Sequence, residues 1–305
     1  MASSPGHRVC GKHNTAPGKR KRTTRGSHLT HGQFAGSVVP SRCRSPIGHQ
    51  SATTFGGPVA EQVALVVGAT GLGEAVAHRL AADGRDLILC DRTAAKASVR
   101  LAGTAAATGA RVVTAGVCLD TPDAFRDALP DLLRRAGHDA IDALVYTLLP
   151  EDAFTPRPLA ALTDDQWRRL AEDPVRHGLT VLQAARELLA RRRGRLVLVV
   201  PAVALEGAAD LVPLATAAET LRALAKSAAR RWAADGITVN LVTPDVFAYG
   251  AEHLRGTDVD RGEAVLPGPT TPADVADAVA LLLDPAAARL TGTTLIVDGG
   301  ALMTP

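Results

Sequence analysis

From residue 62 onward, short apolar runs alternate with longer segments that have the apolar spacing of helices. The runs are continuously apolar rather than alternating, which is typical of strands buried on both faces of a parallel sheet. They occupy residues 63–67, 87–90, 112–117, 143–149, 196–200, 237–242 and 294–297. The helical segments lie between them, at residues 72–82, 123–135, 163–193, 213–234 and 272–283.

This alternation predicts an α/β fold of the Rossmann type. We expect one doubly wound parallel sheet of about seven strands, with right-handed crossovers that place helices on both faces. Gly84 is expected to end the first helix, and Thr271 followed by Pro272 to start the last one. No apolar run is long enough to cross a bilayer, so we expect no membrane association.

The first 60 residues have a different composition from the rest. They hold nine Lys or Arg and no Asp or Glu, whereas the remainder holds 25 basic and 31 acidic residues. We expect a disordered basic tail at 1–60 and a single Rossmann domain at 61–305. Three interpretations of the tail stay open: contact with nucleic acid, an organellar transit peptide, or an over-extended translation start. We favour the third and do not expect nucleic acid as the main partner.

The four cysteines are scattered, without a CxxC pair or a histidine at metal-ligand spacing. We therefore expect neither a metal site nor a disulfide framework, and a reducing cytoplasm as the location. Cys90 and Cys118 fall in apolar runs, which predicts two small buried thiols.

A glycine-rich loop follows the first strand, at residues 68–76 (GATGLGEAV). Glycines at a strand–helix junction let the backbone approach a pyrophosphate, which then lies on the helix N-terminus. Asp91 ends the second strand about 20 residues further on, where an acid can bind ribose hydroxyls. An alternative stays open: the glycines serve only close helix packing, and Asp91 is a cap or a solvated acid. The candidate cofactor residues are Gly68, Thr70, Gly71, Leu72, Gly73, Asp91 and Arg92.

The chain from 62 to 305 resembles the short-chain dehydrogenase/reductase family. Residues 290–300 (LTGTTLIVDGG) are similar to that family's final strand and turn, and residues 226–240 contain another close match. The resemblance implies an NAD(P)-dependent oxidoreductase. If a dinucleotide binds, we expect NAD somewhat more than NADP, because Asp91 disfavours a 2′-phosphate although Arg92 favours one.

The resemblance also assigns positions to the family's catalytic Asn, Ser, Tyr and Lys, and this sequence has other residues there. They are Pro174, Pro201, Leu214 and Ala218. Leucine has no transferable proton and alanine has no charge, and proline removes the hydroxyl that would polarise a substrate oxygen. Residues 201–225 contain no Tyr, Ser or Lys, so a shift of register does not restore them.

Three functions stay open. The favoured one is a family member without the usual redox chemistry that acts by binding. It would be a sensor of a dinucleotide or metabolite, or a silent subunit paired with itself or an active relative through the apolar residues Leu214, Leu221, Leu224 and Ala225. The second is an active reductase with a non-standard acid such as Tyr249, although packing is the commoner role for such a residue. The third is a nucleic-acid-associated protein that acts through the tail.

Overall fold

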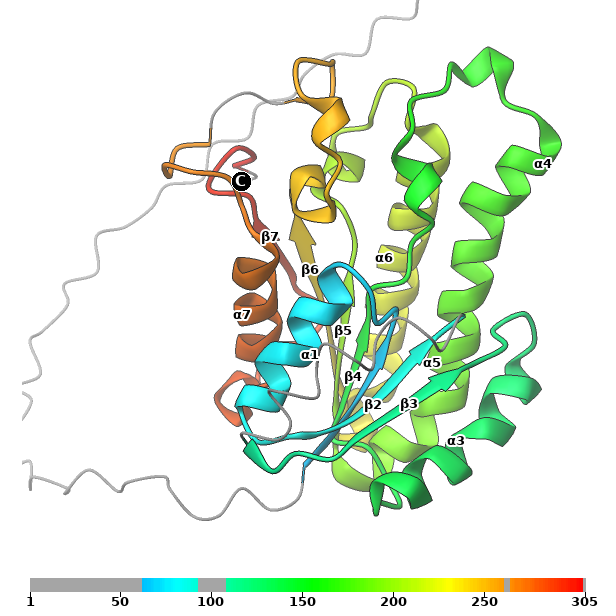
Figure 1. Ribbon diagram of the computed structural model, residues 1–305, viewed down its shortest axis with the longest axis vertical. Coiled ribbons are helices and arrows are strands. Elements are labelled where there is room, and N and C mark those ends of the chain that lie inside the picture. Colours follow the sequence, from blue (N-terminus) through cyan, green and yellow to red (C-terminus); the bar gives the residue numbers. More distant parts are fainter. Residues whose placement is uncertain (1–61, 93–107, 261–263, 304–305) are drawn as a thin grey trace, which may run out of the picture. The chain divides into compact units, whose positions relative to one another are not determined.

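The computed structural model describes residues 62–92, 108–260 and 264–303, so the expected tail at 1–60 lies outside the described residues. Along the chain the strands are β1 (Val63–Val67), β2 (Asp86–Asp91), β3 (Val112–Gly116), β4 (Ala143–Tyr146), β5 (Arg195–Val199), β6 (Thr238–Pro244) and β7 (Thr294–Val297). They form one parallel sheet with the order β3-β2-β1-β4-β5-β6-β7 (Figure 1). The predicted doubly wound fold is confirmed.

Helices cover both faces of this sheet (Figure 1). They are α1 (Leu72–Ala82), α3 (Pro122–Ala136), α4 (Asp164–Trp167), α5 (Asp173–Arg192), α6 (Val212–Trp232) and α7 (Pro272–Leu283). Side chains of α1 and α7 pack in one apolar cluster, and those of α3, α5 and α6 in another. Along β1, Leu65 faces the second cluster while Val66 faces the first, and both are fully buried. Burial on both faces explains why the strand is apolar at every position.

The predicted helix at 163–193 is interrupted, which corrects the sequence analysis. A wide π turn (Arg168–Glu172) separates α4 from α5, and Pro174 lies in the first turn of α5. Proline has no N–H and its ring clashes with the carbonyl four residues earlier, so a regular helix cannot run through it. The buried hydroxyl of Tyr146, at the end of β4, donates a hydrogen bond to the Pro174 carbonyl (3.2 Å).

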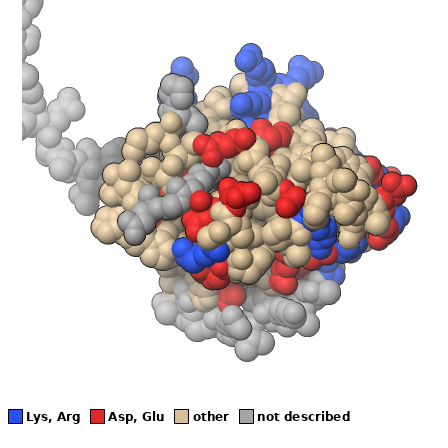
Figure 2. Space-filling view, turned by 90° about the horizontal axis from the view of Figure 1, so that it is seen from above, with Lys and Arg blue, Asp and Glu red and all other residues tan. Residues whose placement is uncertain are grey.

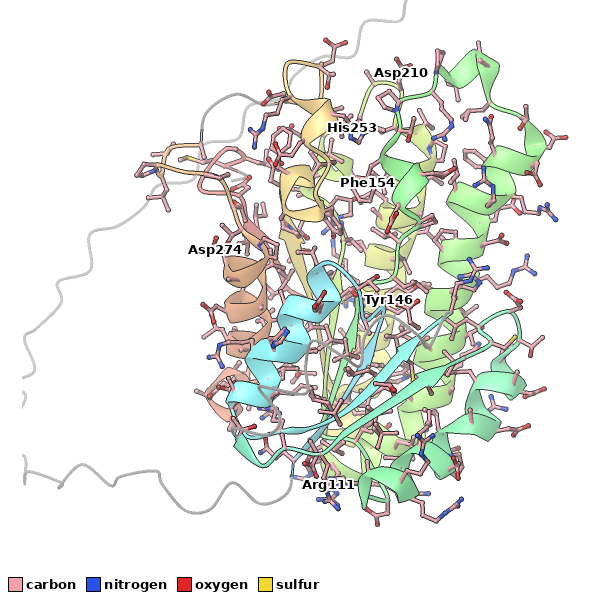
Figure 3. The ribbon with its side chains drawn as sticks, in the orientation of Figure 1. Arg111, Tyr146, Phe154, Asp210, His253 and Asp274 are labelled. Atoms are coloured by element: carbon pink, nitrogen blue, oxygen red, sulfur yellow. The ribbon has the colours of Figure 1, made fainter. Side chains whose placement is uncertain are left out.

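A polar cluster joins β2 to β3 where these strands begin. The Asp86 carboxylate accepts hydrogen bonds from the Arg111 backbone N–H (2.7 Å) and the Arg111 Nε (2.9 Å), and His138 Nε2 lies 2.8 Å from it. Burial raises the pKa of Asp86, but the hydrogen bonds from Arg111 and His138 lower it by more, so its net pKa is depressed. Figure 3 shows Arg111 at one end of the strands, and Phe154 and His253 at the other end.

The two cysteines of the described residues differ. Cys90 is buried in β2, and burial raises the pKa of its thiol to about 12. Cys118 is exposed, which corrects the prediction of a buried thiol: β3 ends at Gly116, before this residue. Across the described ranges no helix is both long enough and apolar enough to cross a bilayer. In the same ranges no three His, Cys, Asp or Glu side chains gather as metal ligands would.

Candidate functional site

A cavity of about 300 Å³ lies at the carboxyl ends of β1, β4 and β6. The strand order reverses between β1 and β4, and open α/β sheets bind their ligands at such a reversal. One wall is the glycine loop after β1, and another is the segment Thr147, Leu148 and Leu149 after β4. The remaining wall comes from the segment after β6 and includes Tyr249 and His253.

The glycines of the loop have two separate roles. A Cβ at Gly73 would lie 1.7 Å from the Gly68 carbonyl oxygen, and one at Gly68 would lie 2.7 Å from Thr147 Oγ1. Both residues are therefore required by packing between α1 and the two strands. Gly71 has a φ of +57° and open space around its Cβ position, and it borders the cavity. Close packing therefore accounts for Gly68 and Gly73, whereas a ligand role for the loop, at Gly71 above all, stays a prediction.

The first turn of α1 opens on this cavity. Leu72 is the first residue of the helix. The amides of Gly73 and Glu74 donate to the carbonyls of Thr70 (3.1 Å) and Gly71 (3.2 Å), so the helix dipole, rather than a row of free amides, favours an anionic group here. Thr70 and Leu72 both line the cavity, and their role in binding a cofactor stays a prediction.

Asp91 holds the backbone of the glycine loop through hydrogen bonds. Its Oδ2 accepts the Ala69 backbone N–H (3.1 Å) and its Oδ1 accepts the Arg92 backbone N–H (2.6 Å). Neither Asp91 nor Arg92 lines the 300 Å³ cavity, and Arg92 adjoins residues outside the described ranges. The structure therefore places Asp91 beside the loop as a supporting acid, and a ribose contact stays a prediction.

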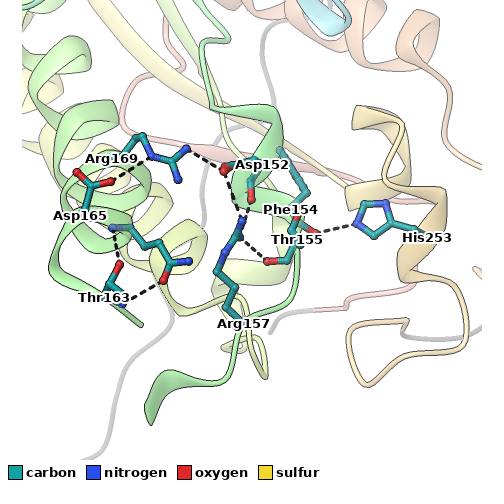
Figure 4. A network of polar contacts seen from close by, with 9 residues as sticks. Asp152, Phe154, Thr155, Arg157, Thr163, Asp165, Arg169 and His253 are labelled. Atoms are coloured by element: carbon teal, nitrogen blue, oxygen red, sulfur yellow. Dashed lines mark hydrogen bonds and ion pairs between the residues drawn. The ribbon is translucent and has the colours of Figure 1, made fainter. Parts of the chain in front are cut away.

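The segment after β4 forms a wall that sequence analysis missed (Figure 4). Asp152 accepts a hydrogen bond from Arg169 (2.9 Å), and Arg157 donates to the carbonyls of Asp152 (2.7 Å) and Thr155 (2.8 Å). His253 Nε2 lies 2.9 Å from the Phe154 carbonyl oxygen and so joins this wall to the segment after β6. No local pattern marks these partners, because His253 is 99 positions from Phe154.

Tyr249 lies in the short turn after β6 (Val246–Tyr249) and lines the cavity. Its ring packs against Phe154 with centroids 4.9 Å apart. Its hydroxyl oxygen is buried and has no hydrogen-bond partner among the described residues. Burial raises the pKa of this hydroxyl well above its usual value, and the positive charge of Arg222 acts in the opposite direction.

The four residues that the sequence analysis expects at the family's catalytic positions are all buried. Pro174 is in α5, Pro201 follows β5, and Leu214 and Ala218 are in α6. None of them lines this cavity. Leu214 belongs to an apolar cluster that fills the adjacent space, with Ala153, Phe154, Leu170, Val203, Leu211, Val246, Ala251, Leu254 and Val259.

The apolar residues of α6 that were expected to form a subunit interface are largely buried within the chain itself. Leu214, Leu221 and Ala225 are fully buried, and Leu224 is partly buried against the same core. A fully buried side chain has no surface left for a second subunit. The predicted interface is therefore corrected for these three residues.

A second cavity, of about 660 Å³, lies beyond the ends of β6 and β7. Its acids support the backbone: Asp245 accepts the Phe247 N–H (2.9 Å), and Asp298 accepts the N–H groups of Gly300 (2.9 Å) and Leu302 (2.8 Å). Figure 2, which looks onto this edge of the molecule, shows acidic side chains gathered near the middle of the face.

The fold and the cavity define a Rossmann-type α/β protein with its ligand site where the strand order reverses. The chain belongs to the short-chain dehydrogenase/reductase family: residues 66–302 match the family described as "Enoyl-(Acyl carrier protein) reductase".

Individual relatives support the same assignment. The chain is 32% identical over 256 residues to cis-4-hydroxycyclohexanecarboxylate dehydrogenase of Sinomonas cyclohexanicum, covering 81% of this chain and 98% of that protein. It is 28% identical over 252 residues to 3-oxoacyl-[acyl-carrier-protein] reductase FabG of Escherichia coli (strain K12), covering 79% and 98%. Among solved structures, a short-chain dehydrogenase from Burkholderia cenocepacia J2315 in complex with NADP has a TM-score of 0.67 at 28% identity, covering 79% of this chain and 97% of that one.

Proposed function

We propose that the protein binds a nicotinamide dinucleotide in the 300 Å³ cavity and does not reduce carbonyls by the family's tyrosine–lysine chemistry. It would act as a cofactor sensor or as a silent subunit. One observation carries this proposal: the cavity beside the glycine loop is open, whereas the neighbouring position Leu214 is fully buried in an apolar cluster.

The residues present fit such a ligand. Gly71 leaves space for the ligand at the start of α1, where the positive end of the helix dipole suits a pyrophosphate. Tyr249 lies in the opposite wall, with its hydroxyl oxygen buried. The cavity volume of about 300 Å³ is at the lower end of the range for small-molecule sites. The solved relative in complex with NADP supports the same ligand class. Between the two dinucleotides we expect NAD somewhat more, because a carboxylate at Asp91 would repel a 2′-phosphate although Arg92 would attract one.

The nicotinamide would supply or accept a hydride when bound. Carbonyl reduction also needs a proton, and the side chains of Leu214 and Ala218 have none to give. Binding of the dinucleotide and turnover are therefore distinct properties of the protein, and each is measured on its own.

Binding is tested by calorimetric titration of the full chain with NADH and NADPH. We expect a micromolar Kd for at least one of them. Gly71→Ala should weaken binding, because it puts a methyl group at the cavity wall. Gly84→Ala is the matched control, since Gly84 also has a positive φ (+80°) and open space but lies beyond the far end of α1. No binding up to millimolar ligand would overturn the proposal.

Turnover is tested with NADPH and a panel of ketones and 3-oxoacyl thioesters. We expect no oxidation of NADPH above the rate without protein. The second candidate function, a reductase that uses Tyr249 as its acid, is favoured by the position of this phenol in the cavity wall. Turnover that Tyr249→Phe abolishes would establish that function instead. A silent-subunit role predicts that the protein changes the rate of an active relative when the two are mixed.

A further inference from the structure

His253 is a histidine of the cavity wall with one ring nitrogen already engaged. It lies in the short turn Glu252–Leu254 after β6, is exposed, and lines the 300 Å³ cavity. Its Nε2 lies 2.9 Å from the Phe154 carbonyl oxygen, which can only accept a hydrogen bond, so Nε2 carries the proton. In the neutral ring Nδ1 is then an acceptor. Within the described ranges, the Phe154 carbonyl is the one hydrogen-bond partner of this ring.

The segment that carries His253 is anchored by apolar packing. Leu254, the next residue, is fully buried in the apolar cluster around Leu214, and Phe154 belongs to the same cluster. The ring of Phe154 also packs against Tyr249. Figure 4 shows the imidazole of His253 turned toward the Phe154 carbonyl. The imidazole is therefore held in the wall through Nε2, which leaves Nδ1 for a ligand.

Few polar side chains of the walls after β4 and β6 are available to a ligand. The Thr147 hydroxyl donates to the Gly68 carbonyl (2.6 Å), and the Tyr249 hydroxyl oxygen is buried. Glu151 and His253 remain, and both are exposed. A carboxylate only accepts hydrogen bonds, and so does Nδ1 of the neutral imidazole. The other side chains of these two walls are apolar: Leu148, Leu149, Phe154 and Ala251.

An anionic group is disfavoured in this half of the cavity. The described lining contains the Glu151 carboxylate and no Lys or Arg. A second negative charge beside Glu151 would be repelled without a cation to offset it. The anionic part of a ligand is favoured instead at the first turn of α1, by the helix dipole. The part that lies beside His253 is therefore expected to be neutral and largely apolar, with a hydrogen-bond donor.

We propose that His253 determines which ligands the cavity accepts: its Nδ1 accepts a hydrogen bond from a neutral N–H or O–H group attached to an apolar ring or chain. Two sources have this chemistry. One is the carboxamide of a nicotinamide dinucleotide, and this source rests on the proposed function. The other is the hydroxyl of a small apolar alcohol. A carboxylate in place of the carboxamide, or a ketone in place of the alcohol, lacks the donor and is rejected.

The proton on Nε2 is tested first, in the full chain without ligand. In protein labelled with nitrogen-15 histidine, the signals that His253→Gln removes identify His253. At about pH 8 the nitrogen shifts should show Nε2 protonated and Nδ1 free, as the bond to Phe154 requires. A proton on Nδ1 would overturn the inference, because the acceptor would then be absent.

Two substitutions separate the ligand contact from the bond to Phe154. Glutamine keeps a donor at the place of Nε2 but has no acceptor at the place of Nδ1, and asparagine has the reverse. His253→Gln should keep the urea midpoint and weaken NADH binding about fivefold. His253→Asn should lower the midpoint and keep most of the affinity. The opposite pattern would mean that the ring serves stability alone, which overturns the inference. His78→Gln in α1, at a histidine that does not line the cavity, is the control and should leave the Kd unchanged.

The source of the donor is tested with matched ligand pairs, by calorimetry and by the Nδ1 shift. NADH should bind about tenfold more tightly than its nicotinic acid analogue, which has a carboxylate in place of the carboxamide. Cyclohexanol should move the Nδ1 shift, and cyclohexanone, which lacks the donor, should not. A response to NADH alone identifies the carboxamide as the source, and a response to cyclohexanol alone identifies the hydroxyl.

The outcomes separate this inference from the proposed function. If no dinucleotide binds but cyclohexanol moves the Nδ1 shift, the proposed function is overturned and the inference stands. If NADH binds equally to the wild type and to His253→Gln, and no ligand moves the Nδ1 shift, the inference is overturned and the proposed function stands. If neither NADH nor cyclohexanol binds, both are overturned.

Discussion

The glycine loop and the space around Leu214 lie at the same edge of the sheet, but different constraints hold them. The loop is fixed by backbone packing, because Gly73 lies directly against the Gly68 carbonyl and Thr147 closes on Gly68. The space around Leu214 is filled by apolar side chains. A glycine-rich loop can therefore persist for packing alone, and the informative residue of the loop is the one that packing does not require, Gly71.

The strongest test of this comparison is a pair of glycine substitutions. Gly73→Ala should lower the free energy of unfolding by more than about 3 kcal/mol, beyond usual overpacking costs, because the Gly68 carbonyl is backbone and cannot move aside. Gly71→Ala should cost only about 1–2 kcal/mol, from its positive φ, and should act mainly on NADH binding. Urea unfolding of both variants checks this. Equal losses would mean that packing constrains both glycines alike.

The apolar cluster around Leu214 is tested by placing tyrosine and lysine at the positions that the family resemblance assigns to them. Leu214→Tyr combined with Ala218→Lys should destabilise the protein by about 3 kcal/mol, since both sites are fully buried and the lysine brings a charge. We expect no carbonyl reduction, because the apolar cluster occupies the space that a substrate would need. Thermal unfolding and an NADPH assay measure the two effects. Appearance of turnover would show that the cleft is open to substrate.

The two acids of β2 are expected to differ in what they affect: Asp86 affects stability and Asp91 affects NADH binding, both by smaller amounts. Asp86, at the start of the strand, has a depressed pKa in the folded state, so its contribution to stability is present above the unfolded pKa of about 4 and is lost as pH falls below it. Asp86→Asn should cost about 1–2 kcal/mol at pH 7 and make stability less dependent on pH below about 4, with NADH affinity unchanged. Asp91→Asn should instead weaken NADH binding, because its carboxylate holds the Ala69 amide of the loop. Urea unfolding across pH, with calorimetry, distinguishes the two.

Apolar periodicity predicted the sheet and the helices within a few residues, because burial on both faces leaves a pattern at every strand position. It predicted one helix at 163–193, although Pro174 already indicated a break. It extended the third strand to Val117, and Cys118, directly after it, was wrongly expected to be buried with that strand. A parallel strand ends where its hydrogen bonds to the neighbouring strands end, and an apolar run in the sequence does not show where that is.

The candidate site was predictable only where its chemistry is local in the sequence. The glycine loop and the expected replacement of the family's residues at Leu214 and Ala218 were predicted from short segments. The Asp152 and Arg169 contact and the His253 bond to Phe154 depend on residues far apart in the chain. Tyr249 was a candidate from its position after a strand, but its orphaned hydroxyl is a property of packing that a single sequence does not show.

The smallest expected effect concerns the charge at the mouth of the cavity. Glu151 is exposed and lines the cavity, so its carboxylate faces a ligand that carries negative phosphates. Across water-filled space this repulsion is weak, and Glu151→Gln should tighten NADH binding about twofold, with a larger gain at low salt. Glu187→Gln is the control and should leave the Kd unchanged, because Glu187 is exposed near the C-terminal end of α5 and does not line the cavity. Weaker binding in Glu151→Gln would mean that this carboxylate accepts a hydrogen bond from the ligand, which would make the wall after β4 a polar contact of the site.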